Sequence, residues 1–295
     1  MDLNKIETVY RKIYKPLMLI PLIAILIAVG ILAYSYEKTG DIIDRDVSLK
    51  GGLTATINTQ VSSLDFEDVL NENFKGKDFL VRKLAEFGSD KQIGVIIEAA
   101  DIKENELKET IEKNLDIKLG KDNYFVEEVG SALGKEFYNQ MIKALIFSFV
   151  LMIIVVAFFY RKLVPCIAVI QAAFADITIT LAVLNLIGYK LSPAGIGALL
   201  LLIGYSVDSD MVLATNVLKR QSEKVFDGFV RSFKTGITMT MTTLAAVLVG
   251  LFFSISPILN EIFLIMLIGL IVDLIDTALV NAGLMMWYTE KKHGN

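Results

Sequence analysis

Long apolar runs dominate the pattern of hydrophobic and polar positions along this chain. Six of them have about 20 residues, the length at which an α-helix crosses a hydrocarbon core of roughly 30 Å. They cover residues 17–36, 141–160, 164–187, 195–218, 236–253 and 262–287. The pattern therefore predicts an α-helical membrane protein with six transmembrane helices.

The segment between the first two runs has a different pattern. Its strand-like stretches, which are rich in β-branched or aromatic residues and bounded by turn formers, are 44–49, 53–60, 92–100 and 123–129. Its stretches with helical spacing are 65–87, with a break near Gly76, and 103–117. This order predicts a small α+β domain of the ferredoxin-like type between helices 1 and 2.

These patterns divide the chain into three parts. Residues 1–36 form the N-terminus and the first transmembrane helix, 37–140 form the extracytoplasmic α+β domain, and 141–295 carry helices 2 to 6 and the C-terminus. The composition also indicates a membrane protein. The chain is 54% hydrophobic with a mean hydropathy of +0.56, which is more than the core of a soluble domain needs.

Lysine and arginine residues near the span ends predict the orientation. Four clusters fall on one side of a six-helix bundle: Lys5, Arg11, Lys12 and Lys15; Arg161 and Lys162; Lys219, Arg220, Lys224, Arg231 and Lys234; Lys291 and Lys292. The two short loops on the other side carry only Lys190. Because basic loops stay in the cytoplasm, we expect a multi-pass protein of the cell membrane with both termini cytoplasmic. The first run lacks a small-residue cleavage site, so we interpret it as a retained anchor.

Cysteine and histidine usage excludes several kinds of chemistry. Cys166 and His293 are the only residues of their types, so an intrachain disulfide, a cysteine metal cage, a catalytic triad and a zincin site are excluded. The stretch 130-GSALGKEF-137 resembles a phosphate loop, but its spacing is one residue short and Glu136 replaces the metal-binding Ser or Thr. We expect no enzymatic activity, cofactor, metal, nucleotide or nucleic acid.

Five acidic residues interrupt the apolar runs: Asp176 in the third, Asp208 and Asp210 in the fourth, and Asp273 and Asp276 in the sixth. Five acids at the centre of a bilayer would together cost on the order of 12 to 18 kcal/mol on insertion scales. They are therefore expected to face protein or water, or to be protonated. Asp208 and Asp210 project about 200° apart on a helix, so one of them is expected to face a neighbouring helix or a second subunit.

Closely spaced buried acids hold protons more tightly than acids in water and influence one another. The pattern thus predicts conformational change coupled to protons. Lys234, just before the fifth run, is in reach of an acid of the fourth helix, and the fifth run adds hydroxyls that can pass protons: Thr235, Thr238, Thr240, Thr242 and Thr243. The alternatives are that the acids join helices, that the threonines bond to their own helix, and that Lys234 is an ordinary membrane anchor.

Three stretches resemble the SecD/SecF family of protein-export membrane proteins, and in particular its six-helix SecF branch of the archaeal type. They are 47-VSLKGG-52, 126-VEEVGSALGKE-136 and 203-IGYSVDSDMVLATNVLKR-220. The positions that match the family motifs are Gly51, Gly52, Gly130, Gly134, Gly204, Tyr205 and Ser206. The chain departs from the motifs at Ser48, where the family has Asp, and at Lys234, where Arg is usual.

The resemblance implies a partner and a role. The partner is a homologous six-helix SecD protein, and together they form a twelve-helix unit related to the resistance-nodulation-division transporters. By this resemblance the unit would assist the Sec translocon channel. Proton flow through the twelve-helix unit would move the outer domains and help to pull the translocating polypeptide. By position, the proton-linked acid maps near Asp208, with Asp210 as the rival, and the family's basic residue maps to Lys234.

Two other functions fit parts of the pattern. A half-size proton-driven exporter acting as a homodimer needs a ligand pocket, but the outer segment is small and charged and has few aromatic residues. An intramembrane aspartyl protease needs paired acids, but the chain lacks a Tyr-Asp dipeptide and a G-x-G-D motif. We therefore favour an export subunit that contacts SecD, the translocon channel, the moving polypeptide and membrane lipids.

Overall fold

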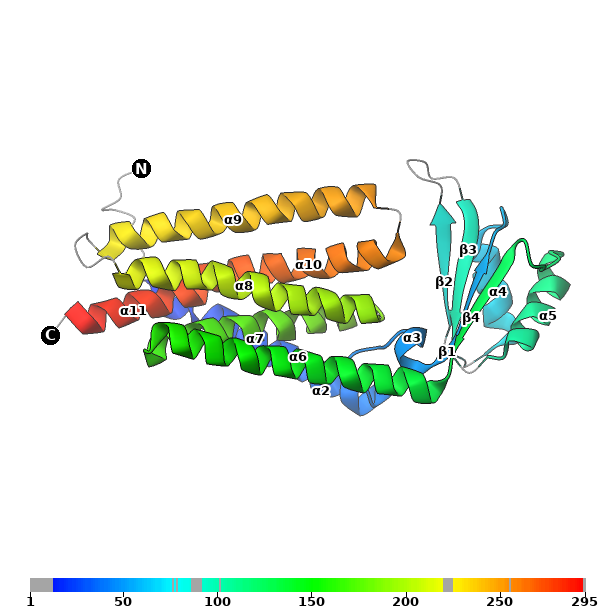
Figure 1. Cartoon of the computed structure of the whole chain (residues 1–295), viewed down its shortest axis with the longest axis horizontal. Coiled ribbons are helices and arrows are strands. Elements are labelled where there is room, and N and C mark those ends of the chain that lie inside the picture. The colour runs from blue at the N-terminus through cyan, green and yellow to red at the C-terminus, as the bar shows by residue number, and fades with distance from the viewer. Residues whose placement is uncertain are drawn as a thin grey trace.

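Long helices account for most of the computed structural model, which describes residues 13–75, 77, 79–85, 92–100, 102–219, 225–254 and 256–293. Six spans among these residues are long and apolar enough to cross a membrane, which confirms the predicted number. They are formed by α2 (Leu19–Thr39), α6 (Ser131–Tyr160), α7 (Leu163–Leu186), α8 (Pro193–Lys219), α9 (Val225–Phe253) and the continuous α10 (Pro257–Asp276), η1 (Thr277–Asn281) and α11 (Ala282–His293). The helices run side by side, with the sheet beyond one end (Figure 1).

The second span begins earlier than its apolar run. The run starts at residue 141, whereas α6 starts at Ser131. The first turns of α6 contain the polar residues Lys135 and Glu136, so hydropathy alone does not include them in the helix. They extend α6 towards the sheet, where α6 packs against the short helix α3 (Val47–Lys50).

The outer domain has the chain order β-α-β-β-α-β. Its elements are β1 (Gly52–Ile57), α4 (Ser63–Asn73), β2 (Phe79–Ala85), β3 (Gln92–Ala99), α5 (Glu104–Leu115) and β4 (Tyr124–Val129). The strands form one sheet in the order β2-β3-β1-β4, and every neighbouring pair is antiparallel. The strands predicted at 53–60, 92–100 and 123–129 and the helix at 103–117 are therefore present.

Two local predictions are wrong. Residues 79–85, which were expected to continue a helix, form β2, an edge strand that pairs with β3 along its whole length. Residues 44–49, which were expected to form a strand, make only a single bridge between Arg45 and Leu191 and then turn into α3. The side chain of Asp46 accepts a hydrogen bond from the Ser48 backbone and so starts that helix.

One face of the sheet carries the core of the outer domain. Leu53, Ala55 and Ile57 alternate along β1 and are fully buried. They pack with residues of β3, α4 and α5, including Val95, Ile97, Phe66, Leu70, Leu107 and Ile111. Helices α4 and α5 lie on the side of the sheet away from the membrane helices (Figure 1). The opposite face of the sheet therefore faces the ends of the membrane spans.

Hydrogen bonds connect the segment that follows α2 to the end of α7 and to the loop between α7 and α8. The N–H of Asp46 donates to the carbonyl of Leu191 at 3.0 Å, and the N–H of Leu191 donates to the carbonyl of Asp44 at 2.7 Å. The side chain of Asn185 donates to the carbonyl of Ile42 at 2.7 Å. These contacts position the outer domain relative to the bundle.

Helix α7 is enclosed by α2, α8 and α10. Its buried face is rich in small side chains, among them Ala168, Ala172, Ala173 and Ala175, which let the neighbouring backbones approach closely. The start of α2 and the end of α11 lie at the same end of the bundle, opposite to the sheet (Figure 1). Of the basic residues used above for orientation, Lys5, Arg11, Lys12, Arg220 and Lys224 lie outside the described residues.

Candidate functional site

Four of the five intramembrane acids meet inside the bundle. Asp176 on α7, Asp210 on α8, and Asp273 and Asp276 at the end of α10 are each only 1% exposed. The three helices pack against one another, so residues about a hundred positions apart in the chain become electrostatic neighbours. We call these four residues the acid cluster.

Hydrogen bonds from the surrounding helices hold the acid cluster. The hydroxyl of Ser206 donates to Asp176 Oδ2 at 2.5 Å, and the hydroxyl of Thr277 donates to Asp210 Oδ1 at 2.9 Å. Gln171 Nε2 donates to Asp276 Oδ1 at 3.4 Å. Ser206 and Asp210 are four residues apart, so they share one face of α8.

A segment of π-helix completes the site. The last span changes from α-helix to π-helix over Thr277–Asn281, directly after Asp276, and then returns to α-helix. The segment places the side chains of Thr277 and Asn281 beside Asp210. π-Helical turns are rare and occur frequently at functional sites, because they offset the side chains from the regular helical register.

Several polar atoms of this site have no hydrogen-bond partner among the described residues. They are Asp176 Oδ1, Asp210 Oδ2, both carboxyl oxygens of Asp273, Asp276 Oδ2, and both polar atoms of the Asn281 side chain. Within the same residues, no ion pair joins the acid cluster to a lysine or an arginine. Buried polar atoms normally find partners, so this cluster has spare capacity for protons or water.

The structure does not bring Asp208 or Lys234 to the acid cluster. Asp208 is exposed on another side of α8, as the spacing from Asp210 requires. Lys234 is exposed on α9 and forms no ion pair within the part of the chain that the structure describes. Of the two rival positions in the fourth span, Asp210 is therefore the one that meets the other acids.

The threonines of α9 mostly bond to their own helix. The hydroxyls of Thr235, Thr238 and Thr242 are exposed and donate to the backbone carbonyls four residues earlier, at 2.7 to 3.0 Å. Thr240 is buried. This geometry favours the alternative in which these hydroxyls serve the helix rather than the acids.

The motif glycines at the base of the outer domain have a steric role. Gly51 and Gly52 adopt positive φ angles of 89° and 150°, a conformation that other residues rarely take. A Cβ atom on Gly134 of α6 would lie 2.7 Å from the backbone nitrogen of Gly51. α6 therefore crosses the turn between α3 and β1 at a distance that requires glycine. Gly130 is the N-cap of α6 and has open space around it.

The motif residues of α8 have different surroundings. Gly204 is exposed, Ser206 holds Asp176, and the half-buried Tyr205 has a buried hydroxyl with no partner among the described residues. Sequence reasoning missed Gln171, Thr277 and Asn281. The only sequence feature that marks these three residues is that they are polar within apolar runs. The sequence does not show which neighbour each one contacts, because that depends on helix packing. A search of the described residues finds no group of three or more His, Cys, Asp or Glu side chains that could hold a metal ion.

Comparison with known proteins agrees with this architecture. The family model described as "Protein export membrane protein SecD/SecF, C-terminal" matches residues 108–291. The protein-export membrane protein SecF of Methanolacinia petrolearia is 36% identical and covers 98% of this chain and 97% of its own length. SecF of Pyrococcus furiosus is 33% identical, with coverage of 95% and 93%.

A solved structure shares the fold. The crystal structure of SecDF, a translocon-associated membrane protein from Thermus thermophilus, matches with a TM-score of 0.72 at 20% sequence identity. The match covers 95% of this chain and 38% of the SecDF chain, so this chain corresponds to somewhat more than a third of that protein. With its six apolar spans, the family match and these relatives, the chain belongs to the SecD/SecF family of protein-export membrane proteins.

Proposed function

We propose that this protein is an accessory subunit of the Sec protein-export translocon. It acts with a SecD homologue, sits in the cell membrane with both termini in the cytoplasm, and promotes late steps of polypeptide translocation. Support comes from relatives named for protein export that match nearly the whole chain, and from the shared fold with a translocon-associated SecDF. The outer domain, residues 37–140, fits the ferredoxin-like type, because its β-α-β-β-α-β order and antiparallel sheet are those of that fold.

An uncovered face of α8 supports a membrane partner. Gly197, Leu201, Gly204 and Asp208 follow helical spacing along this face, and a Cβ atom on either glycine would meet nothing within 4 Å. An acid that faces lipid costs about 2.5 to 3.5 kcal/mol at the centre of a helix, whereas a partner helix can cover it. Glycines let such a helix approach closely. SecD is the partner that the family suggests.

The acid cluster carries the proposal of proton coupling. Four carboxyl groups from three helices share one buried site and retain unbonded oxygens, so the number of protons that they hold changes the net charge between α8 and the last span. Such a change alters the repulsion among the acids, and the π-helical segment beside Asp210 is a natural place for the backbone to respond. The proton-linked acid of the fourth span is then Asp210 rather than Asp208.

Replacing Asp210 by Asn tests this role. In vesicles that contain the translocon and the SecD partner, Asp210→Asn should abolish the stimulation of export by a proton gradient, because an amide cannot take up and release the proton. The complex should still assemble, since Asn has nearly the same shape. Asp208→Asn is the matched control: it should retain the stimulation, because this side chain lies outside the cluster.

Export stimulation that is undiminished in Asp210→Asn would contradict the proton role of this residue. Affinity purification of the wild-type protein from its native membrane tests the partner separately. Recovery of a SecD homologue supports the export subunit, and recovery of only a second copy of this chain favours the homodimeric exporter.

A further inference from the structure

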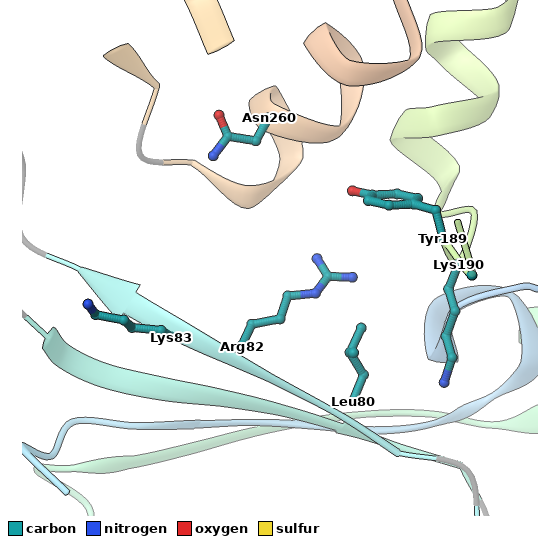
Figure 2. Close-up of a pocket in the computed structure, with 7 residues that line it drawn as sticks. Leu80, Arg82, Lys83, Tyr189, Lys190 and Asn260 are labelled. Carbon is teal, nitrogen blue, oxygen red and sulfur yellow. The ribbon is translucent and has the colours of Figure 1, made fainter. Parts of the chain in front are cut away.

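A cavity of about 350 Å³ lies between the outer domain and the ends of the membrane helices. The outer domain contributes Leu80, Arg82 and Lys83 of β2, from the edge of the sheet. The bundle contributes Gly188, Tyr189 and Lys190 from the loop between α7 and α8, and Asn260 from the first turn of α10. Figure 2 shows the Arg82 guanidinium and the Tyr189 hydroxyl pointing into the same space, with Asn260 at its edge and Lys83 and Lys190 on either side.

The charged residues that line this cavity, within the described part of the chain, are all basic. The acids nearby, Asp46, Glu98 and Glu261, are buried, and each has at least one partner within the protein. Asp46 accepts from the Ser48 backbone, Glu261 accepts from Ser192, and Glu98 pairs with Arg82 at 3.5 Å. Glu98 thereby holds the guanidinium in place, and the remaining N–H groups of Arg82 are available to a ligand.

The neutral lining residues add hydrogen-bonding groups. Burial raises the pKa of Tyr189 to about 12, so its hydroxyl keeps its proton and can donate. The carboxamide of Asn260, which also lines the cavity, offers the N–H groups of its Nδ2 as donors. An arginine, a tyrosine hydroxyl and an amide nitrogen that line one cavity suit an oxyanion such as a phosphate group.

The residues next to the lining identify the source of that group. Leu186 and Ile187 immediately precede Gly188, and Ile258 and Leu259 immediately precede Asn260. All four side chains are exposed apolar groups at the outer ends of membrane spans. A ligand that fills the cavity with an anionic group therefore has apolar surface directly beside it, as a lipid with its acyl chains requires.

We propose that this cavity binds the phosphate-bearing headgroup of an anionic membrane lipid, held by Arg82, Tyr189 and Asn260. The volume suits a headgroup, because small-ligand sites begin at about 300 Å³. A lipid in this position bridges β2 to the bundle and sets the distance between the outer domain and the membrane surface. The proposal does not depend on the export role.

Native mass spectrometry of the purified full chain tests the proposal. The protein is incubated in detergent with phosphatidylglycerol or phosphatidylcholine, and the bound lipid is counted. The wild-type protein should retain phosphatidylglycerol in preference to phosphatidylcholine. The double variant Arg82→Gln with Glu98→Gln should bind it roughly tenfold more weakly, the loss expected for one charge-assisted hydrogen bond.

A second test variant and one control complete the experiment. The double substitution avoids leaving a buried Glu98 without its partner. Tyr189→Phe removes only a hydroxyl and should weaken binding several-fold, so it tests the site even if the double variant does not fold. Lys113→Gln, an exposed position on α5 far from the cavity lining, should leave binding unchanged.

Equal retention of the two lipids, or unchanged retention of phosphatidylglycerol by both the double variant and Tyr189→Phe, overturns the proposal. Inorganic phosphate is added in a separate series. If it displaces phosphatidylglycerol at the same concentration at which the lipid binds, the site holds a free phosphate and the assignment to a lipid is wrong.

Discussion

Replacing Ser192 by alanine should weaken the attachment of the start of α8 to α10. Ser192 precedes Pro193 at the start of α8, and its hydroxyl has two tasks. It donates to Glu261 Oε2 at 2.6 Å, and it accepts from the backbone N–H groups of Ala194 and Gly195 at 3.0 and 3.4 Å. The first contact ties the loop before α8 to α10, and the second caps α8.

The size of the effect follows from these contacts. Loss of an N-cap side chain costs about 1 kcal/mol, and loss of a hydrogen bond to a charged group costs roughly 1.5 to 3 kcal/mol. Ser192→Ala should therefore lower the free energy of unfolding by about 2.5 to 4 kcal/mol. The backbone N–H of Ser192, which donates to Glu261 Oε1 at 2.9 Å, remains and keeps the carboxyl group from being left without a donor.

Unfolding in mixed detergent micelles measures this difference, with the single tryptophan, Trp287, as the fluorescent probe. Ser256→Ala is a matched control, because Ser256 also precedes a proline at the start of a helix but its side chain makes no cap hydrogen bond. The control should change the unfolding free energy by less than about 0.5 kcal/mol. If Ser192→Ala changes it as little as the control does, the reasoning is refuted.

Two further substitutions test other parts of the fold. Gly134→Ala should destabilise the protein by about 1 to 3 kcal/mol, because the added Cβ atom would lie 2.7 Å from the backbone of Gly51. Gly30→Ala, inside α2, is the control: its added Cβ atom meets nothing within 4 Å and should not destabilise the protein in the same unfolding assay. Glu98→Gln should remove a pH dependence of stability. Burial raises the pKa of Glu98 above 4.5, so the folded state binds its proton more tightly and stability falls as pH rises through the raised value. A wild-type protein whose unfolding midpoint shows the same pH dependence as the variant would contradict this.

Local pattern was sufficient for the six spans and for most of the outer domain. A run of apolar residues at least as long as the bilayer core predicts a span whatever surrounds it, which explains why the number of spans is correct. The motif glycines were also identified from the sequence, but the sequence does not explain why these positions require glycine. Only the crossing of α6 over the turn at Gly51 shows why Gly134 lacks a side chain.

Tertiary structure decided which acids lie together. Spacing along α8 shows that Asp208 and Asp210 point in different directions, but it does not show which of them faces α7 and α10. Helix packing makes that choice and buries Asp210 beside Asp176 and Asp273. The π-helical turn brings Thr277 to Asp210. Such a turn changes the helical register only over a few residues, so it leaves no hydrophobic pattern in the sequence by which it could be predicted.

Strand β2 and the start of α6 show the same limit. The stretch Phe79–Ala85 becomes a strand because β3 pairs with it, and α6 begins as early as Ser131 because α3 packs beside its first turns. In both cases the deciding contacts join residues distant in the sequence. The chain by itself thus determined which segments cross the membrane and which residue types they bury, because these depend on local hydropathy. The identity of the residues that meet depends on long-range packing, which only the folded structure contains.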